Sequence, residues 1–202
     1  MLKKKLRPPL IIRCPSKTRP KNVIFLDRDG VINRFPGVGS YVTSQKDFHL
    51  LPGAVRGIRY LSQNGFEVNV VSNQGCIAHR LITPKALRGL TMRMLRKVRK
   101  AGGEIQGVFY CPHRTSNRCF CKKPNTLLFK KALRHRKFDV SKVYFIGDSR
   151  EDIKAAKNLG CCSLLVLSGR TKKKDLELFE TKPDVVKRNL LEAARWIIRK
   201  KS

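Results

Sequence analysis

The sequence predicts an α/β protein built on a doubly wound parallel sheet. Short apolar runs that fit strands buried on both faces alternate with longer amphipathic segments that fit helices. Polar residues directly follow several of these apolar runs. In a parallel sheet such positions meet at one edge, where proteins of this fold class bind their ligands.

The predicted elements alternate from residue 22 onward. The first strand is 23–26, and a helix over 53–64 follows, ended by Gly65. After a second strand at 68–71, a long helix begins at Thr83-Pro84, because a hydroxyl cap and a first-turn proline favour initiation. The further strands are 105–110, 143–146 and 163–167, and the further helices are 127–133, 151–159 and 190–198.

Length and composition limit how many domains the chain can form. With 202 residues, 41% of them hydrophobic, the chain suffices for one domain with a substantial core. Residues 1–21 are basic and proline-rich, which predicts a flexible or surface-draped arm before a single domain over 22–202. No apolar run approaches the ~20 residues of a membrane span, and no secretory signal is recognisable. We expect a cytoplasmic monomer, in a reducing compartment that suits seven irregularly spaced cysteines.

The charge balance is strongly basic. Forty-five Lys and Arg against fourteen Asp and Glu give a net charge of +31. Several of the few acids cluster in sequence at Asp27, Asp29, Asp148, Glu151 and Asp152. An acidic pocket in a basic shell fits a metal site that serves anionic substrates. Nonspecific contact with nucleic acid or another polyanion is the competing interpretation, and a generally basic proteome is a third.

The segment Asp27-Arg28-Asp29-Gly30, at the end of the first predicted strand, carries the strongest chemical signal. Residues two apart in an extended segment point the same way, so the two aspartates can converge on one point. Their mutual repulsion favours a cation between them, which suggests Mg²⁺. One carboxylate can then act as nucleophile and the other as acid and base, as phosphoryl transfer requires.

A second group of cation ligands lies after the third predicted strand. Cys111, His113, Cys119 and Cys121 supply three sulfurs and one imidazole within eleven residues. This set suits a tetrahedral structural Zn²⁺ site. The cluster directly precedes Lys122-Lys123-Pro124, so a bound metal would fix the loop that carries Lys123.

The strand-end motifs, taken in order, resemble those of the haloacid-dehalogenase-like phosphatases. They are the Asp27 segment, Ser72-Asn73-Gln74, Lys123-Pro124 and Gly147-Asp148. Together with the Cys/His cluster they are most similar to the heptose bisphosphate phosphatases and the related histidinol-phosphate phosphatases. The resemblance runs from about residue 22 to 197. It implies a capless haloacid-dehalogenase-like domain with a zinc-binding loop.

The resemblance also implies roles for individual residues. Asp27 would attack phosphorus and become a phosphoaspartate, while Asp29 would protonate the leaving oxygen and later activate water. Mg²⁺ would be held by Asp27, the Asp29 carbonyl and Asp148. Ser72 and Lys123 would hold the phosphoryl oxygens. Further substrate contacts would come from the following residues: Tyr41, Asn73, Gln74 and Lys122.

Some positions depart from the family pattern. Ser72 stands where Thr is usual, and Lys122 stands where Arg is usual, which removes bidentate phosphate geometry. Residues 114–118 make the zinc loop short for the family. These changes leave the catalytic interpretation intact but leave the exact substrate open.

The sequence therefore predicts a Mg²⁺-dependent phosphatase that cleaves one phosphomonoester of a small sugar bisphosphate of the D-glycero-D-manno-heptose 1,7-bisphosphate type. The alternatives are a histidinol-phosphate phosphatase, a nucleic-acid 3′-phosphatase, and a basic nucleic-acid-binding protein on a decayed phosphatase fold. Intact acidic and lysine positions argue against decay, and aromatic content of only 7% argues against a base-stacking surface.

Overall fold

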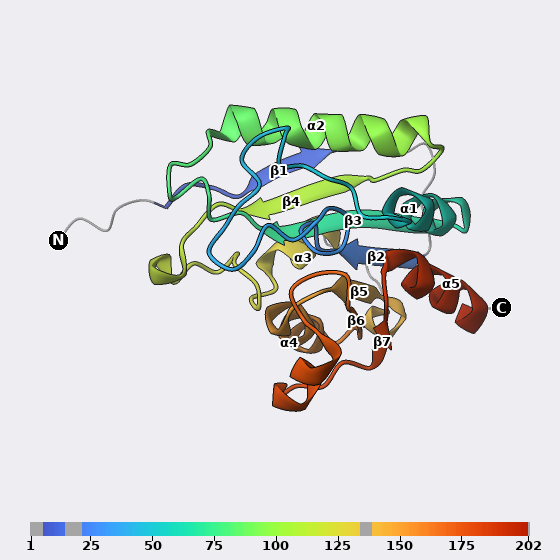
Figure 1. Cartoon of the computed structure of the whole chain (residues 1–202). Helices are drawn as coiled ribbons and strands as arrows, with labels where there is room; N and C mark the ends of the chain where they lie inside the picture. The colour runs from blue at the N-terminus through green and yellow to red at the C-terminus, as the bar shows by residue number, and fades with distance from the viewer. Residues whose placement is uncertain (1–5, 15–21, 134–138, 202) are drawn as a thin grey trace.

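A single sheet with helices on both faces forms the molecule (Figure 1). The structure, a computed structural model, describes residues 6–14, 22–133 and 139–201. Its strands are β1 (Leu10–Arg13), β2 (Asn22–Leu26), β3 (Phe66–Asn73), β4 (Gly107–Cys111), β5 (Tyr144–Gly147), β6 (Cys162–Val166) and β7 (Val185–Lys187). Its helices are α1 (Ala54–Gln63), α2 (Pro84–Lys100), α3 (Leu127–Leu133), α4 (Arg150–Leu159) and α5 (Leu190–Lys201). Short 3₁₀ helices lie at Thr115–Asn117, Val140–Lys142 and Lys173–Leu178.

The sheet confirms the predicted doubly wound fold. Its strand order is β1-β4-β3-β2-β5-β6-β7, and every neighbouring pair except β1 and β4 is parallel. The central strand β2 pairs with β3 on one side and with β5 on the other, so Leu26 lies opposite both Val70 and Ile146. The carboxyl ends of β2, β3 and β5 therefore meet at one edge, as the strand-end motifs predicted.

Two apolar layers bury the sheet. Ile58 of α1, Met94 of α2 and Ile197 of α5 pack on one face. Phe129 of α3 and Ala155 of α4 pack on the other. Because both faces are covered, β2 is a continuous apolar run over residues 23–26, which explains why the sequence identified it. Strand β3 instead buries the polar residues Glu67 and Asn69, and the Asn69 side-chain amide donates a hydrogen bond to Glu67.

Local sequence signals set the boundaries of helices α2 and α4. At the start of α2 the Thr83 side chain accepts a hydrogen bond from the Ala86 amide at 3.1 Å, and Pro84 occupies the first turn. At the start of α4, Ser149 and Asp152 form a reciprocal capping box. Helix α4 ends at Gly160, whose φ of 81° is a left-handed conformation that favours glycine.

The N-terminal segment differs from the prediction of a flexible arm over 1–21. Leu10–Arg13 forms β1, which pairs antiparallel with β4 at the edge of the sheet. Ile12 is only 4% exposed, so burial of its side chain together with edge pairing accounts for the order of this strand. Residues 1–5 and 15–21 lie outside the described part of the chain.

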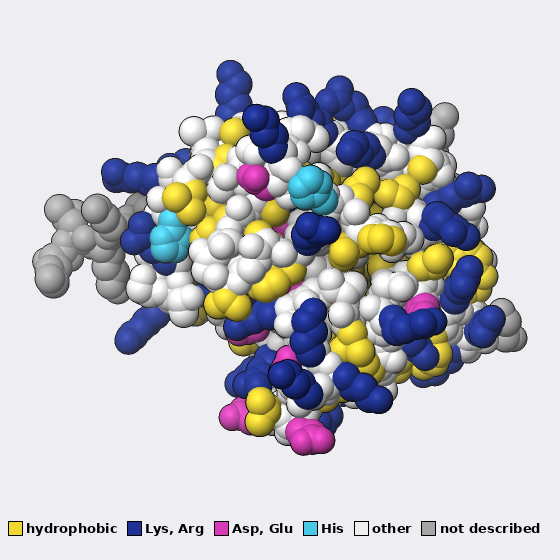
Figure 2. Space-filling view, viewed as in Figure 1, with side chains coloured by type: hydrophobic (Ala, Val, Ile, Leu, Met, Phe, Trp, Pro, Cys, Tyr) yellow, Lys and Arg dark blue, Asp and Glu magenta, His cyan; other side chains and the backbone are white. Residues whose placement is uncertain are grey.

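Basic side chains cover much of the visible surface, and several of the few acidic ones gather toward the lower edge (Figure 2). Helix α2 contributes the largest uniform group: it carries no acidic residue, and all of its Lys and Arg side chains are exposed. Among the described residues, no helix combines the length and the apolar character that crossing a membrane requires.

Candidate active site and zinc-ligand cluster

A cavity of about 280 Å³ opens at the carboxyl ends of β2, β3 and β5. The cavity is lined by the residues that follow these strands, by the loop over 35–41, by the loop that carries Lys123 and by the loop after β6. The predicted site residues that line it are Asp27, Asp29, Tyr41, Ser72, Asn73, Lys122, Lys123 and Asp148. Residues far apart in the sequence thus meet around one space.

Asp27 lies at the floor of this cavity, directly after β2. Its amide donates to the Ile146 carbonyl at 2.9 Å, which continues the β2–β5 pairing and fixes the backbone there. The side chain is buried. Burial raises the pKa of Asp27 to about 6, against the opposing effect of Lys123 and with a further increase from Asp152.

Lys123 links the acidic groups to one another. Its Nζ lies 2.9 Å from Asp27 Oδ1 and 2.7 Å from Asp152 Oδ1, and it donates to the Val71 carbonyl at 2.9 Å. Burial alone lowers the pKa of Lys123, but the carboxylates of Asp152 and Asp27 outweigh burial and raise it. The Lys123 amide donates to Asn73 Oδ1 at 2.9 Å, so β3 fixes the position of the lysine loop.

Asp148 and Asp152 complete a cluster of three buried carboxylates with Asp27, whose oxygens lie within 4.8 Å of one another. Burial, followed by the charges of Asp152 and Asp27, raises the pKa of Asp148. The Arg170 amide donates to Asp148 Oδ2 at 2.6 Å. The chain can approach this closely only at glycine, because a Cβ on Gly30 or on Gly169 would lie 2.0 Å from that same oxygen.

Asp29 is held apart from this cluster by a set of donors. Arg28 contacts its carboxylate through Nε at 3.0 Å and through NH2 at 2.9 and 3.0 Å. Asn33 and Gln74 donate their side-chain amides to it, each at 2.8 Å. Arg28 is itself fully buried, with its guanidinium over the Tyr110 ring at 5.6 Å, so the network is rigidly packed.

The predicted substrate-contact residues occupy different positions. Ser72, Asn73 and Lys122 line the cavity, as does Tyr41, whose ring lies against His79 with centroids 5.7 Å apart. Gln74 does not line it: the side chain is completely buried, and its amide donates to Asp29 and to Ser72. The structure therefore gives Gln74 a supporting position beside Asp29 and Ser72, and its contact with substrate stays a prediction.

Sequence reasoning missed several residues that shape this site. The sequence did contain evidence for the role of Arg28. An arginine between two aspartates at the end of a buried strand can itself be buried only if a carboxylate pairs with it, and this predicts an ion pair with a neighbouring aspartate. Gly169 and Arg170 follow β6 in a stretch that reads as an ordinary turn. Only the fold reveals that this turn approaches Asp148.

The predicted zinc ligands form a second compact cluster. Cys111, His113, Cys119 and Cys121 are all buried, with each ligand atom within 4.8 Å of the others. The Cys111–Cys119 and Cys121–Cys119 sulfur pairs are both 3.6 Å apart. Sulfurs ~2.3 Å from a tetrahedral zinc lie about 3.8 Å apart, so the residues fit this ion. A hydrogen bond from Cys111, aided by Cys119 and His113 against burial, lowers the pKa of Cys121 to about 5.

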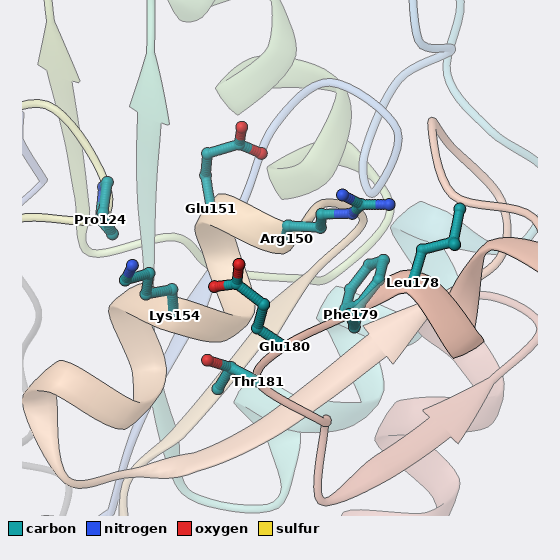
Figure 3. A pocket seen from close by; sticks show the side chains of 8 residues that line it. All are labelled: Pro124, Arg150, Glu151, Lys154, Leu178, Phe179, Glu180 and Thr181. Atoms are coloured by element: carbon teal, nitrogen blue, oxygen red, sulfur yellow. The ribbon is translucent and has the colours of Figure 1, made fainter.

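A smaller cavity of about 210 Å³ lies beside the active-site cavity (Figure 3). Arg150, Glu151 and Lys154 of α4 face the segment 178–181 across it, and Pro124 closes one side. Glu151 lines both cavities, and its carboxylate lies 3.7 Å from Arg170 NH1. This ion pair therefore stands between the two spaces.

Comparison with known proteins places these features in a family. Residues 120–193, which include Lys123, Asp148 and Asp152, match the family model for HAD-hydrolase-like proteins. The D-glycero-beta-D-manno-heptose-1,7-bisphosphate 7-phosphatase of Neisseria meningitidis serogroup A is 34% identical over 151 residues, which cover 75% of this chain and 80% of that protein. The enzyme of the same name from Vibrio cholerae is 30% identical over 188 residues, covering 90% of this chain and 98% of that protein.

A solved structure agrees with these relatives. The D,D-heptose 1,7-bisphosphate phosphatase of B. bronchiseptica, determined with magnesium and phosphate, matches with a TM-score of 0.81 and 30% identity. The match covers 89% of this chain and 99% of that one. The chain therefore belongs to the heptose-1,7-bisphosphate phosphatase family of haloacid-dehalogenase-like hydrolases, and it is a phosphoric monoester hydrolase.

Proposed function

We propose that this enzyme removes one phosphate from a sugar bisphosphate of the D-glycero-D-manno-heptose 1,7-bisphosphate type, with Mg²⁺ and through a phosphoaspartate at Asp27. The single observation that carries the proposal is the position of Asp27 at the floor of the cavity, with Lys123 Nζ at 2.9 Å. Relatives named for the same substrate support the substrate class.

The charge of the site supports a divalent cation. The ammonium of Lys123 pairs with Asp27 and Asp152, and Asp148 completes the cluster of buried carboxylates. In this cluster, the three carboxylates against the ammonium of Lys123 leave two negative charges, and buried charge of that kind is costly unless it is compensated. Asp27 and Asp148, with the Asp29 carbonyl, would hold Mg²⁺, which when bound neutralises charge on the transferring phosphoryl group.

The first chemical step falls to Asp27 and Asp29. An Asp27 carboxylate oxygen attacks phosphorus, forming an O–P bond while the bond from phosphorus to the sugar oxygen breaks. Asp29 gives its proton to that leaving oxygen. Ser72 and Lys123 donate to the phosphoryl oxygens, which carry the developing negative charge.

The second step regenerates the enzyme. Asp29, now ionised, removes a proton from water as the water oxygen bonds to phosphorus. The bond from phosphorus to Asp27 breaks, and phosphate leaves. The fixed donors around Asp29 keep the carboxylate in one position for both proton transfers.

The remote part of the substrate would contact the rim of the cavity. Lys122 and Arg170 line this rim and supply positive charge for a second phosphate, while Tyr41 and Asn73 offer polar atoms to the sugar. The Lys122 ammonium cannot make the two parallel hydrogen bonds that an arginine guanidinium makes to a phosphate. We therefore expect Lys122 to restrict the position of the second phosphate less than an arginine would.

The Cys/His cluster would hold one structural Zn²⁺, since its four protein ligands leave no position for a reacting group. Elemental analysis should find about one zinc per chain. Zinc removal should lower activity by loosening the loop from Cys111 to Lys123, while circular dichroism of the sheet changes little. Full activity in protein without zinc would contradict this role.

The basic surface favours weak binding of nucleic acid as a second property. Exposed Lys and Arg along α2 suit nonspecific contact with a polyanion. We propose such contact as weak binding, without 3′-phosphatase turnover, for an enzyme that acts as a cytoplasmic monomer. Histidinol phosphate remains the other small-molecule candidate, as in related phosphatases.

Phosphate release from a substrate panel tests the proposed function. The panel contains a heptose 1,7-bisphosphate, hexose bisphosphates, histidinol phosphate and a 3′-phosphorylated oligonucleotide. We expect the largest kcat/KM with the heptose bisphosphate and no turnover without Mg²⁺. Efficient release from the oligonucleotide or from histidinol phosphate, with none from any sugar bisphosphate, would overturn the proposal.

A further inference from the structure

The two ring nitrogens of His113 have different partners. Nδ1 faces the cysteine sulfurs, 3.2 Å from Cys121 and 3.6 Å from Cys111. Nε2 lies 2.9 Å from the backbone carbonyl of Arg7, outside the cluster. A carbonyl only accepts hydrogen bonds, so Nε2 must carry the proton and Nδ1 presents its lone pair to the sulfurs. The Arg7 carbonyl thereby selects the tautomer that binds a metal through Nδ1.

The backbone around Arg7 is anchored to the strand that carries the first cysteine of the cluster. Strand β1 pairs with β4 in a register that sets Leu10 opposite Tyr110, one residue before Cys111. The Cys14 amide continues this attachment with a hydrogen bond to Gln106 at 2.8 Å. The Arg7 carbonyl therefore reaches His113 from a segment fixed on the same strand.

Two prolines connect Arg7 to β1. Pro8 and Pro9 have restricted φ angles, and a residue that precedes proline is biased toward extended backbone. The spacer between the carbonyl and the paired strand is therefore stiff. Little freedom has to be lost when the carbonyl meets the His113 ring.

We propose that residues 7–13 are part of the zinc site: the Arg7 carbonyl, positioned by β1, fixes the ring of His113 and strengthens zinc retention. The inference rests on the proposed zinc site and adds to it a contribution from a residue 106 positions earlier in the chain than His113. Loss of such an outer partner typically weakens metal binding by about 10–100-fold. Because the same loop leads to Lys123, the segment also stabilises the position of the active-site lysine.

The experiment compares zinc release to a chromophoric chelator among variants of the full chain. A variant that lacks residues 2–9 loses the Arg7 carbonyl but keeps all of β1, and we expect it to release zinc about 10–100-fold faster. Two matched controls retain the carbonyl: a variant that lacks residues 2–5, and Arg7→Ala. Both should release zinc at the wild-type rate.

A His113→Cys background isolates the hydrogen bond. Cysteine can ligate zinc but has no second nitrogen for the Arg7 carbonyl, so deletion of residues 2–9 should change zinc release little in this background. Acceleration of release by the same factor in both backgrounds would overturn the proposal, since the deletion would then act through general loss of β1.

A second variant tests the proposal even if the variant that lacks residues 2–9 fails to fold. Pro8→Gly combined with Pro9→Gly keeps the whole segment and loosens only the spacer, so zinc release should again accelerate. Unchanged release in both this variant and the folded deletion would refute the role of residues 7–13. Zinc absent from the wild-type chain would refute the zinc site together with this inference, whereas phosphate release from the substrate panel tests the catalytic proposal separately.

Discussion

At the scale of single residues, Asp29 is a partly buried carboxylate with an unusual number of hydrogen-bond donors around it. It accepts hydrogen bonds from Arg28 and Asn33, which lie in the loop after β2, and from Gln74, which directly follows β3. Each donor is itself packed or buried, so the carboxylate cannot swing freely within the cavity. Such fixed positioning suits a group that must give and take a proton at one place.

Replacing this carboxylate tests its role in proton transfer. Asp29→Asn should lower kcat by about 10²–10⁴-fold, because an amide cannot act as general acid or base. Mg²⁺ affinity should change much less, since the backbone carbonyl remains. Steady-state kinetics and a Mg²⁺ titration measure both effects, with Asp47→Asn as a control at an exposed carboxylate outside the cavity. A kcat near the wild-type value would exclude the proposed proton transfer.

The residue scale also shows what the sequence could and could not predict. The convergence of Asp27 with Asp148 followed from their positions after parallel strands. The pairing of Arg28 with Asp29 did not, because it depends on Tyr110, 82 residues further along the chain, to cover the guanidinium. Contacts of this kind depend on tertiary packing and leave no local pattern.

At the scale of elements, the loop after β6 shapes the carboxylate cluster. Gly169→Ala would place a Cβ 2.0 Å from Asp148 Oδ2, so the carboxylate must move. We expect a marked loss of Mg²⁺ affinity, measured by the concentration of Mg²⁺ that gives half-maximal activity. Displacement of Asp148 also separates it from the Arg170 amide, which removes a short hydrogen bond.

Gly89→Ala provides the matched control. A Cβ at Gly89 meets nothing within 4 Å, and the residue lies inside α2. Alanine there should leave Mg²⁺ dependence unchanged and stabilise the protein by about 1 kcal/mol, the usual helix preference over glycine. Equal Mg²⁺ dependence in the Gly169 and Gly89 variants would contradict the steric argument.

Asp184, just before β7, gives a pH-dependent contribution to stability. Its carboxylate accepts hydrogen bonds from the Ser163 amide at 2.8 Å and from the Ser163 hydroxyl at 2.7 Å, and it pairs with Lys157. Partial burial raises the pKa of Asp184, but hydrogen bonds from Lys157 and Ser163 outweigh burial and lower it to about 2. A lowered pKa means that folding favours the ionised form.

The stabilisation is therefore complete above the ordinary aspartate pKa of about 4 and disappears as pH falls through about 2. Because the Asp184 side chain is 40% exposed, solvent screening reduces the effect of its lowered pKa on stability. Asp184→Asn should lower Tm by about 2–4 °C at pH 7, the shift that corresponds to about 1 kcal/mol in a chain of this size. Thermal melts of both proteins should converge near pH 2. A difference in Tm that does not depend on pH would show that the charge contributes nothing.

The elements themselves were predictable to different degrees. The central strands β2 and β3 are buried on both faces, and their mainly apolar residues identify them in the sequence. The edge strands β1 and β7 have only four and three residues. Strand β1 depends on pairing with β4, about 100 residues later, and the surrounding basic, proline-rich sequence suggested an arm. Short edge strands are specified by their partners more than by their own residues.

At the scale of the whole molecule, the net charge of +31 should influence substrate capture. A sugar bisphosphate should be cleaved with a larger kcat/KM than the monophosphate that carries only the cleaved group. Surface steering should vanish as salt rises beyond 0.1 M, where the screening length is ~10 Å, whereas cavity contacts should persist. Measuring both substrates from low to high salt separates these effects. No preference at any salt would exclude a second phosphate contact.

The central claim is that Asp27 forms a covalent intermediate during phosphate release. Rapid mixing of the enzyme with Mg²⁺ and a heptose 1,7-bisphosphate, acid quenching within one turnover and peptide mapping test it directly. We predict a phosphoryl group on the peptide that contains Asp27 in the wild type, and neither phosphopeptide nor phosphate release in Asp27→Asn. Near-normal turnover in Asp27→Asn, or a phosphoryl group on another residue, would contradict the account.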